Sequence, residues 1–227
     1  MSIDREAMSK ALSRSLFAKF PERALDHVLA IATPLDAPAG GVIYQEAGQS
    51  RCVLVVSGLI RVYMTAERGR EVTVRYARSG DVLGIPTIVG GPAPVDVEII
   101  SDAQVLAFPV ELLRSLARTE PEIGWLFATE VTRRLYDTLE ALAGNTFGTV
   151  RQRVARHLLD LAASSNSRPL VASVTQQDLA AAVGSVRAVV ARSLGELRDA
   201  GLVGSSSAGI TILDPDRLLD EAWSRGV

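Results

Sequence analysis

Hydrophobic residues change their spacing twice along the chain. Over residues 1–33 they recur at helical intervals, whereas from residue 34 to about residue 109 they form short runs separated by glycine turns. Many short apolar runs in succession predict a β-sandwich or barrel, here a small jelly roll. After Pro109 the spacing becomes helical again. The expected strands are Val42–Tyr44, Cys52–Val56, Leu59–Met64, Glu71–Tyr76, Val97–Ile100 and Val105–Phe108.

A long amphipathic helix is predicted to begin at Pro121, because proline is favoured in the first turn of a helix. Its apolar residues lie mostly four apart on one face, and Gly144-Asn145 is expected to end it and to serve as a hinge. A lone surface helix of this length has little to cover its apolar face, so we expect it to pair with a second copy of the chain. The alternative is that the stripe packs on the β-domain. The predicted dimer contacts are Phe127, Val131, Leu135 and Leu142.

Residues 174–194 have the pattern of a DNA-reading helix-turn-helix. Thr175 can cap the first helix, with Asp178 three residues later, and Gly184 supplies the turn. Ser185 is expected to cap a second helix whose inward stripe is Val186, Val190, Leu194 and Leu197. Arg187 and Arg192 fall outside that stripe, and outward arginines near the start of such a helix suit the DNA major groove. The alternative is a generic helical hairpin with solvated charges.

A β-hairpin is predicted directly after this motif, from Leu202-Val203 to Ile210–Leu213, which makes the C-terminal region a winged helix-turn-helix. A short helix is expected to follow Asp214. The pattern predicts an α+β chain with three parts. They are a β-roll domain over residues 1–120, a dimerisation helix and hinge over 121–146, and a DNA-binding domain over 147–227.

Composition and charge narrow the function classes. The chain of 227 residues has one cysteine. No apolar run is long enough to span a membrane, and the charged N-terminus lacks the apolar core of a signal peptide. We therefore expect a soluble cytoplasmic protein without internal disulfides and without membrane contact. The net charge is −2, but residues 151–213 hold 7 arginines against 4 acidic residues, a local charge of +3. A basic segment around the helix-turn-helix is typical of a surface that faces phosphates.

The order of roll, long helix and winged helix-turn-helix resembles the cAMP receptor protein/Fnr (Crp/Fnr) family of bacterial transcription regulators over about residues 20 to 213. The resemblance implies a homodimer that places two recognition helices on a pseudo-palindromic operator in double-stranded DNA. It also implies a cyclic-nucleotide-binding-like roll and RNA polymerase as a further partner. The matching segments are Val56–Val62, Ser79–Gly84, Glu120-Pro121, Arg133–Leu135 and Gly184–Arg187.

The resemblance assigns roles to residues of the recognition helix. Arg187 stands where the family's arginine reads a guanine, and Arg192 is a second contact to a base or phosphate. Ala188 replaces a glutamate, so the half-site should differ from TGTGA in at least one base pair. The serines and threonine of this region are candidate phosphate contacts, or else simple caps and a flexible loop. The DNA-binding candidates are Thr175, Ser185, Val186, Arg187, Ala188, Arg192 and Ser206.

The effector region departs from the cAMP-binding members. After Gly84 those members have a glutamate for the ribose, whereas this chain has Ile85-Pro86. Their Arg-Ser pair for the cyclic phosphate falls on Val95-Asp96, which supplies an anion in place of a cation. We therefore expect a pocket that does not use cAMP, with another effector or none, and no cofactor. The candidate pocket residues are Gly84, Ile85, Pro86, Val95, Asp96, Arg134, Thr138 and Leu139.

Other functions find less support in the sequence. A protein-interaction module that uses the winged helix to bind a protein partner is the alternative to DNA recognition. An enzyme is not expected, because no nucleophile–base pair, metal-ligand cluster or glycine-rich phosphate loop is visible. Cys52 is interpreted as a small buried hydrophobe, and His27 and His157 are isolated.

Overall fold

The computed structural model describes residues 4–44, 51–65, 71–164 and 169–223. The chain divides into two compact units, Met1–Thr138 and Leu139–Val227. The division falls within the longest helix, α5 (Pro121–Phe147). Each unit has its own buried hydrophobic core.

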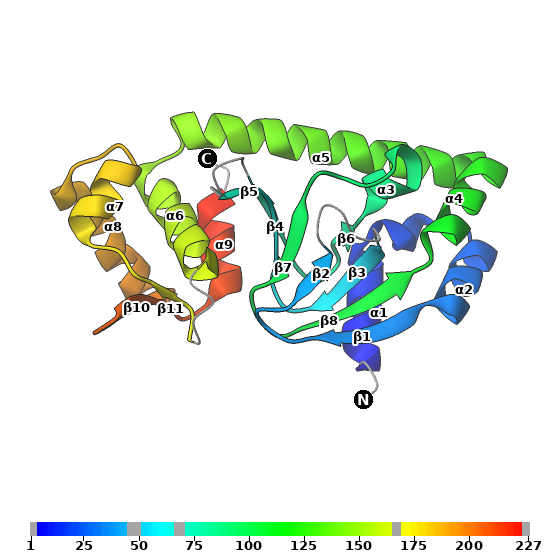
Figure 1. Ribbon diagram of the computed structural model, residues 1–227, viewed down its shortest axis with the longest axis horizontal. Helices are drawn as coiled ribbons and strands as arrows, with labels where there is room; N and C mark the ends of the chain where they lie inside the picture. Colours follow the sequence, from blue (N-terminus) through cyan, green and yellow to red (C-terminus); the bar gives the residue numbers. More distant parts are fainter. Residues whose placement is uncertain (1–3, 45–50, 66–70, 165–168, 224–227) are drawn as a thin grey trace. The chain divides into compact units, whose positions relative to one another are not determined.

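Eight short strands of the first unit form a jelly roll of two antiparallel four-stranded sheets (Figure 1). The strand orders are β1-β8-β3-β6 and β2-β7-β4-β5, so successive strands lie in different sheets except for the β4–β5 hairpin. This confirms the predicted roll and adds β1 and β6 to the expected strands. The strands are β1 (Thr33–Ala37), β2 (Val42–Tyr44), β3 (Cys52–Ser57), β4 (Ile60–Thr65), β5 (Glu71–Ala77), β6 (Val82–Leu83), β7 (Asp96–Ile99) and β8 (Ala103–Phe108).

The strands of the two sheets differ in their pattern of apolar and polar residues because the outer faces of the sheets have different surroundings. Strand β3 is buried on both faces: Val53 and Val55 point between the sheets, while Leu54 points toward the helices. A strand covered on both sides reads as a continuous apolar run. On β4, by contrast, Ile60 and Val62 face the inter-sheet core and polar residues alternate with them.

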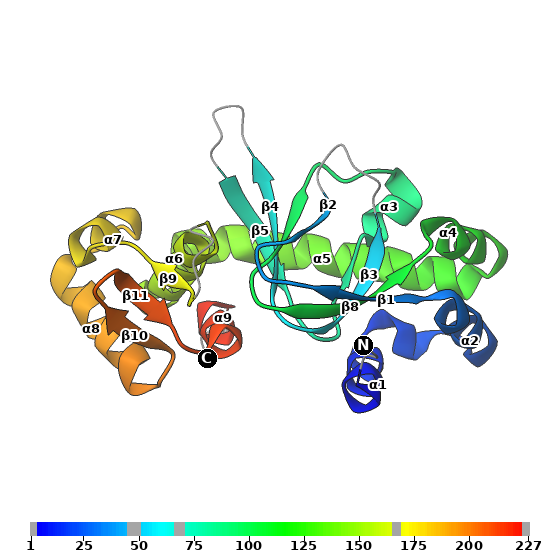
Figure 2. The ribbon, with the colours of Figure 1, turned by 60° about the horizontal axis from the view of Figure 1, so that its bottom comes forward.

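Helices at both ends of the first unit cover the outer face of the β1-β8-β3-β6 sheet (Figure 2). Aromatic rings fill the space beneath them: Phe17 lies 4.6 Å from Phe108 and 5.1 Å from Phe20, measured between ring centroids. The helices are α1 (Arg5–Arg14), the 3₁₀ turn η1 (Leu16–Lys19), α2 (Glu22–Ile31), α4 (Val110–Thr119) and the first turns of α5. A further short helix, α3 (Ile85–Gly90), follows β6.

Helix α5 begins at Pro121, as predicted, but it runs for 27 residues to Phe147. The expectation that Gly144-Asn145 ends the helix was wrong, because both residues are helical. Backbone hydrogen bonding within a long helix evidently outweighs the cost of one internal glycine, about 1 kcal/mol.

The second unit is a winged helix-turn-helix, as predicted. Its three-stranded sheet has the order β10-β11-β9, and the β10–β11 hairpin is the wing. The helix α6 supplies buried leucines and alanines to the core of this unit. The elements are α6 (Val150–Ser164), β9 (Val171–Ala172), α7 (Gln176–Ala182), α8 (Arg187–Asp199), β10 (Val203–Ser206), β11 (Gly209–Ile212) and α9 (Pro215–Trp223).

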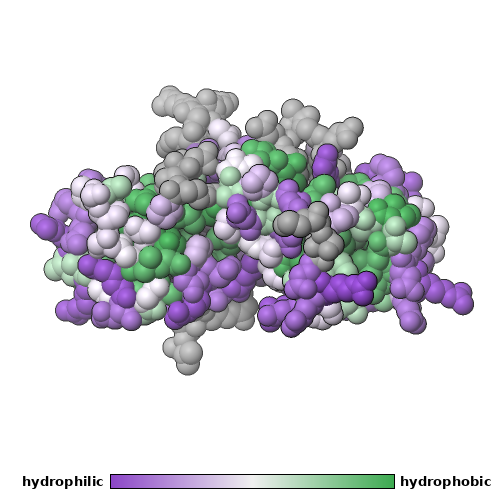
Figure 3. All heavy atoms as spheres, turned by 90° about the horizontal axis from the view of Figure 1, so that it is seen from below, coloured by the Kyte–Doolittle hydropathy of each residue, from purple (hydrophilic) through white to green (hydrophobic). Residues whose placement is uncertain are grey.

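Polar side chains cover much of the face drawn in Figure 3, with apolar atoms between them. Among the described helices, none combines the length and the apolar character that crossing a bilayer requires.

Candidate functional site

Thr175 caps the first helix of the motif, as predicted. Its Oγ1 accepts a hydrogen bond from the Asp178 backbone N–H at 3.1 Å and donates one to Asp178 Oδ2 at 2.7 Å. The cap fixes where α7 begins, since it satisfies an N–H that has no partner inside the helix. A phosphate contact by the exposed Thr175 hydroxyl stays a prediction.

The turn between α7 and α8 depends on Gly184, whose φ of +61° lies in the left-handed region. The Ser185 N–H donates to the Ala180 carbonyl at 2.9 Å, which closes the end of α7. The prediction that Ser185 caps α8 was wrong: the N-cap residue is Val186, and no side chain caps this helix. The start of α8 is therefore uncapped by the protein itself.

The inward face of α8 is formed by Val190, Leu194 and Leu197, all fully buried or nearly so. Val186, predicted to share that stripe, is 64% exposed because it precedes the helix and does not follow its periodicity. Arg187 and Arg192 are exposed. The helix thus has a buried apolar side and a solvent side that carries these two arginines.

The outward arginines of α8 are not neutralised within the chain. Among the described residues, neither Arg187 nor Arg192 has a side-chain hydrogen bond or ion pair. Arg187 is the first residue of α8, and the first turn holds no acidic residue. A cation at the positive end of a helix dipole is locally unfavourable, so this arrangement favours an anionic partner from outside.

Ala188 and Ser206 are both exposed. Ala188 follows Arg187 on α8 and presents only a methyl group. Ser206 ends the first strand of the wing, pairs with Gly209, and donates its hydroxyl to the Gly209 carbonyl at 3.2 Å. The second unit therefore places the predicted DNA-binding residues on or beside its helix-turn-helix and wing.

The segment that starts the effector region, Gly84 to Thr87, is tightly built. Gly84 has a φ of +83° and is indispensable, because a Cβ there would lie 2.1 Å from the Arg51 carbonyl oxygen. Ile85 is buried in the core beneath the helices, whereas the next residue, Pro86, is exposed. Thr87 donates its hydroxyl to the Gly84 carbonyl at 2.6 Å. Neither the Ile85 nor the Pro86 side chain has a polar group to offer a ligand.

The remaining candidates of the effector region have different surroundings. Val95 packs against the inter-sheet core, and Asp96 accepts a hydrogen bond from the Thr65 hydroxyl at 3.3 Å. Thr138 donates its hydroxyl to the Arg134 carbonyl of its own helix at 2.8 Å. Leu139 is 52% exposed.

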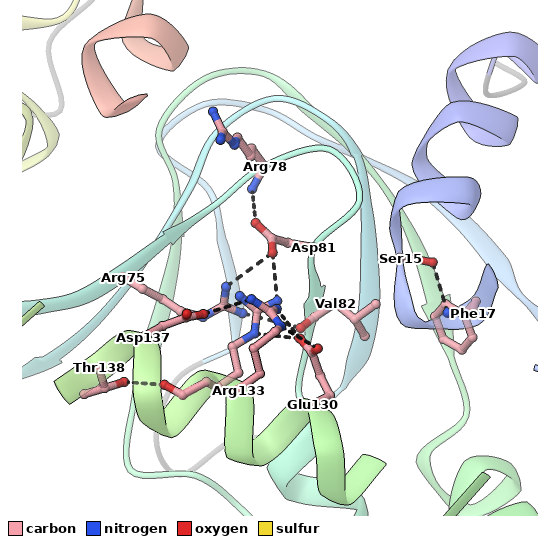
Figure 4. A network of polar contacts seen from close by, with 11 residues as sticks. Ser15, Phe17, Arg75, Arg78, Asp81, Val82, Glu130, Arg133, Asp137 and Thr138 are labelled. Carbon is pink, nitrogen blue, oxygen red and sulfur yellow. Dashed lines mark hydrogen bonds and ion pairs between the residues drawn. The ribbon is translucent and has the colours of Figure 1, made fainter. Parts of the chain in front are cut away.

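Arg134 is held by carboxylates of the first unit. Its Nη2 lies 2.7 Å from Asp81 Oδ1, and its Nε lies 2.8 Å from Glu130 Oε1. Asp81 is also 3.8 Å from Arg75 Nη1 and accepts the Arg78 backbone N–H at 3.0 Å. Figure 4 shows Arg75 and Asp81 of the roll directed toward the part of α5 that carries Glu130 and Thr138. We call Arg75, Asp81, Glu130 and Arg134 the arginine–carboxylate cluster.

Burial changes the acid–base behaviour of this cluster. Desolvation alone would raise the pKa of Asp81, but Arg75 and Arg134 beside it hold that pKa below its usual value. Desolvation and the neighbouring Arg134 lower the pKa of Arg75 to about 10, against the opposing charge of Asp81. Asp81 and Arg75 are therefore both charged near neutral pH, and ion pairs connect the members of the cluster.

Two family models match the chain. The cyclic nucleotide-binding domain model matches residues 34–120, and the Crp-like helix-turn-helix model matches residues 152–221. The transcriptional regulator SdrP of Thermus thermophilus is 30% identical over 186 residues, which cover 78% of this chain and 87% of that protein.

The chain belongs to the Crp/Fnr family of transcription regulators. It is a Crp-like regulator with a helix-turn-helix DNA-binding domain, and this family is made of transcription regulators and not enzymes. The CRP-like cAMP-activated global transcriptional regulator of Mycobacterium tuberculosis is 27% identical over 196 residues, 83% of this chain and 88% of that protein. The solved structure of FixK2 from Bradyrhizobium japonicum shares the fold, with a TM-score of 0.55 and 22% identity over 86% of this chain and all of that one.

In this Crp/Fnr chain the prediction that Phe127 is a dimer contact was wrong. Phe127 is 1% exposed and packs in the core with Phe20, so it cannot form an interface with another chain. Val131 and Leu135 lie further along the stripe and are exposed. The side chain of Leu142 lies outside the described residues.

Two aromatic residues on α5, Trp125 and Tyr136, are 74% and 60% exposed and so are not part of the core. At 100° per residue, both side chains lie on the same side of α5 as Leu139 and opposite Ile123 and Phe127. A wide apolar surface thus runs along α5 away from the core.

Cys52 is fully buried in β3, which agrees with its interpretation as a small hydrophobe. Burial raises the pKa of its thiol to about 12, so almost no thiolate exists at neutral pH. Arg75 and Glu130, which no motif had singled out, are the residues of the arginine–carboxylate cluster that sequence reasoning failed to find.

Proposed function

We propose that this Crp/Fnr chain is a homodimer that binds a specific pseudo-palindromic DNA sequence through α8 and does not use cAMP as its effector. The observation that carries the DNA part is the exposed, unneutralised start of α8. Arg187 lies there without an internal partner among the described residues, on a helix end that no side chain caps. Local helix rules are broken at this point, and such breaks are expected where a ligand supplies the missing interactions.

The chemistry of this surface favours nucleic acid over protein. Arg187 can donate two hydrogen bonds to the O6 and N7 atoms of a guanine, and the Ala188 methyl can contact a thymine methyl. The first N–H groups of α8 point along the helix axis and can receive a phosphate oxygen. Thr175, Ser185, Arg192 and Ser206 lie on the helix-turn-helix or its wing and are candidate contacts to the DNA backbone.

The homodimer rests on the exposed surface of α5. Val131, Leu135 and Leu139 form an apolar band beside Trp125 and Tyr136. Exposed apolar surface of this extent on one helix favours pairing with the same helix of a second copy. Replacement of the central Leu135 by glutamate should convert the dimer to a monomer in sedimentation experiments.

Independence from cAMP rests on the effector region. The relative from Mycobacterium tuberculosis is cAMP-activated by name. This chain, however, has Ile85 where the resemblance places a carboxylate that accepts from the ribose, and Val95 and Asp96 where the cyclic phosphate needs hydrogen-bond donors. Arg134, the remaining cation, already binds Asp81 and Glu130. The effector, if the protein has one, is expected to be a less anionic molecule than a cyclic nucleotide, and RNA polymerase is a further proposed partner.

The deciding experiment is selection of duplexes from a random library, followed by affinity measurements with the wild type and Arg187→Ala. The wild type should bind its selected duplex with a steep loss of affinity as salt rises. Arg187→Ala should lose about 1–3 kcal/mol of binding to that duplex and should no longer prefer its guanine. Arg217→Ala on α9 is the matched control, because Arg217 lies near its own carboxylate partner Asp214. Equal base preference in wild type and Arg187→Ala would contradict the assignment of α8.

A further inference from the structure

An open hollow of about 420 Å³ lies in the second unit beside the helix-turn-helix. One wall consists of Arg153, Arg156, His157 and Asp160 from α6, and the other of the turn residues Ala182, Val183 and Gly184. Positions 153, 156, 157 and 160 share one side of α6, opposite the side on which Val154 and Leu158 enter the core. The hollow therefore presents side chains that do not serve the hydrophobic core.

Four described arginines have a buried side-chain nitrogen without a hydrogen-bond partner, namely Arg75, Arg134, Arg153 and Arg156, but only Arg153 among them has no other side-chain contact within the described residues. Its Nε atom is buried and has no hydrogen-bond partner. Within the described part of the chain, its guanidinium makes no ion pair either. The guanidinium therefore brings to the lining of the hollow a positive charge that no carboxylate of the described residues meets, and an anion in the hollow can supply that partner.

The other charges of the hollow are held in place by the domain. The Arg156 guanidinium donates to the Ala222 carbonyl at 2.9 Å and stacks 4.6 Å from the Trp223 ring centroid. Asp160 is the carboxylate of the hollow. Burial lowers the pKa of Arg156, and the negative charge of Asp160 opposes this shift only in part. With Arg156 and Asp160 offsetting each other, Arg153 makes the hollow electropositive, and His157 can add a second donor.

The turn that forms the second wall connects the hollow to the recognition helix. Gly184 has open space where a Cβ would be, so a ligand can approach its backbone closely. Arg187, the first residue of α8, follows three residues later. An anion in the hollow would thus lie beside the end of α8 that carries the proposed base contacts.

We propose that this hollow is a binding site for a phosphate oxyanion, and that a backbone phosphodiester of the bound DNA occupies it. The inference rests on the proposed function and deepens it, because it adds a contact to the DNA backbone that sequence reasoning did not assign. Arg153 is its principal donor, since a guanidinium can offer two parallel hydrogen bonds to one phosphate. A phosphate contact fixes the register of the protein on DNA and carries no base preference.

The experiment compares Arg153→Gln with Arg217→Gln, which removes the same charge from α9 of the same domain. Affinity for the selected duplex and for a scrambled duplex is measured at several salt concentrations. Each phosphate contact contributes roughly 0.9 to the slope of log K against log salt, so a dimer with two hollows should lose about 1.8. Arg153→Gln should weaken both duplexes by the same factor, about tenfold or more at 0.1 M salt. Arg217→Gln should match the wild type.

Three results would overturn the inference. The first is a salt slope that is the same in Arg153→Gln as in the wild type. If the wild type still binds specifically and Arg187→Ala does not, the proposed function is unaffected by this result. Another is a loss confined to the selected duplex, which would make Arg153 a base contact. The third comes from titrating inorganic phosphate into the DNA-free protein and following the His157 imidazole by NMR. Saturation below about 1 mM that Arg153→Gln abolishes would identify free phosphate as the occupant, whereas no saturation supports the DNA backbone.

Discussion

The chain holds two groups of arginines with opposite surroundings. In the first unit, Arg134 and Arg75 lie against Asp81, and the charges of the arginine–carboxylate cluster are met within the domain. In the second unit, Arg187 and Arg192 face solvent without partners among the described residues. Arginines that find carboxylates nearby contribute to holding a domain together, whereas arginines left unpaired on a surface are available to an anion from outside. The contrast separates a structural use of arginine from a binding use in one chain.

The largest effect should come from breaking the cluster. Asp81→Asn removes the carboxylate between Arg75 and Arg134, whose side chains are only about one-fifth exposed. Loss of Asp81 leaves Arg75 without its carboxylate partner and leaves Arg134 with Glu130 alone, so the free energy of unfolding should fall by about 3 kcal/mol. Urea denaturation followed by circular dichroism measures this difference.

The matched control for Asp81→Asn is Asp137→Asn on α5. Asp137 pairs with Arg133 at 2.9 Å, but both side chains are about half exposed. A surface pair of this kind contributes at most about 1 kcal/mol. Equal losses in the two variants would show that Asp81 has no special structural role.

Arg187→Ala should give the opposite pattern, with a large effect on DNA binding and almost none on stability. Its free energy of unfolding should stay within about 0.5 kcal/mol of the wild type, as for other surface substitutions. The change also removes a cation from the positive end of the α8 dipole, which favours the folded state slightly. Thermal and urea unfolding of Arg187→Ala and Asp81→Asn side by side therefore test the contrast directly. A clear destabilisation by Arg187→Ala would break it.

Acid should weaken the cluster. The folded-state pKa of Asp81 is lowered, so its contribution to stability is present above the unfolded pKa of about 3.9 and is lost as the pH falls through the lower folded pKa. Consequently the difference in unfolding free energy between wild type and Asp81→Asn should be constant from pH 6 to 7 and should shrink below about pH 4. Urea titrations at several pH values measure it. A difference that persists unchanged at pH 2.5 would mean that the carboxylate charge is not responsible.

The parts of the fold that short stretches of sequence determine were predictable. The central strands are marked by apolar runs between glycines, whereas β6 has only two residues and β1 carries Pro34 and Asp36, so neither has a periodic signature. Thr175 and Gly184 could be placed because a helix cap and a left-handed turn depend on local chemistry. Local signals of the same kind at Ser185 and at Gly144-Asn145 did not produce a cap or a helix end, so local chemistry was sufficient at some positions only.

Packing across the chain was not predictable to the same degree. A stripe of residues four apart on α5 is apolar throughout, but only the folded domain shows that Phe127 enters the core while Leu135 stays exposed. Val186 looked like the first residue of an inward stripe, yet α8 begins one residue later and leaves it in solvent. Arg75 had no motif, and its position beside Asp81 and Arg134 follows only from the approach of the roll to α5.

The smallest expected effect is the response to cAMP. A ligand at 100 times its dissociation constant stabilises a protein by about 2.7 kcal/mol, which shifts the melting temperature by several degrees. We expect no shift here, because Ile85 has no side-chain acceptor for the ribose hydroxyl and Val95 has no side-chain donor for the cyclic phosphate. Asp96 would repel that phosphate, and Arg134 would have to leave Asp81 and Glu130. A thermal-shift titration with cAMP and with cGMP measures this. A clear shift that Arg134→Ala abolishes would mean that the nucleotide competes successfully with two internal carboxylates, and the contrast between paired and unpaired arginines would then no longer separate structure from binding.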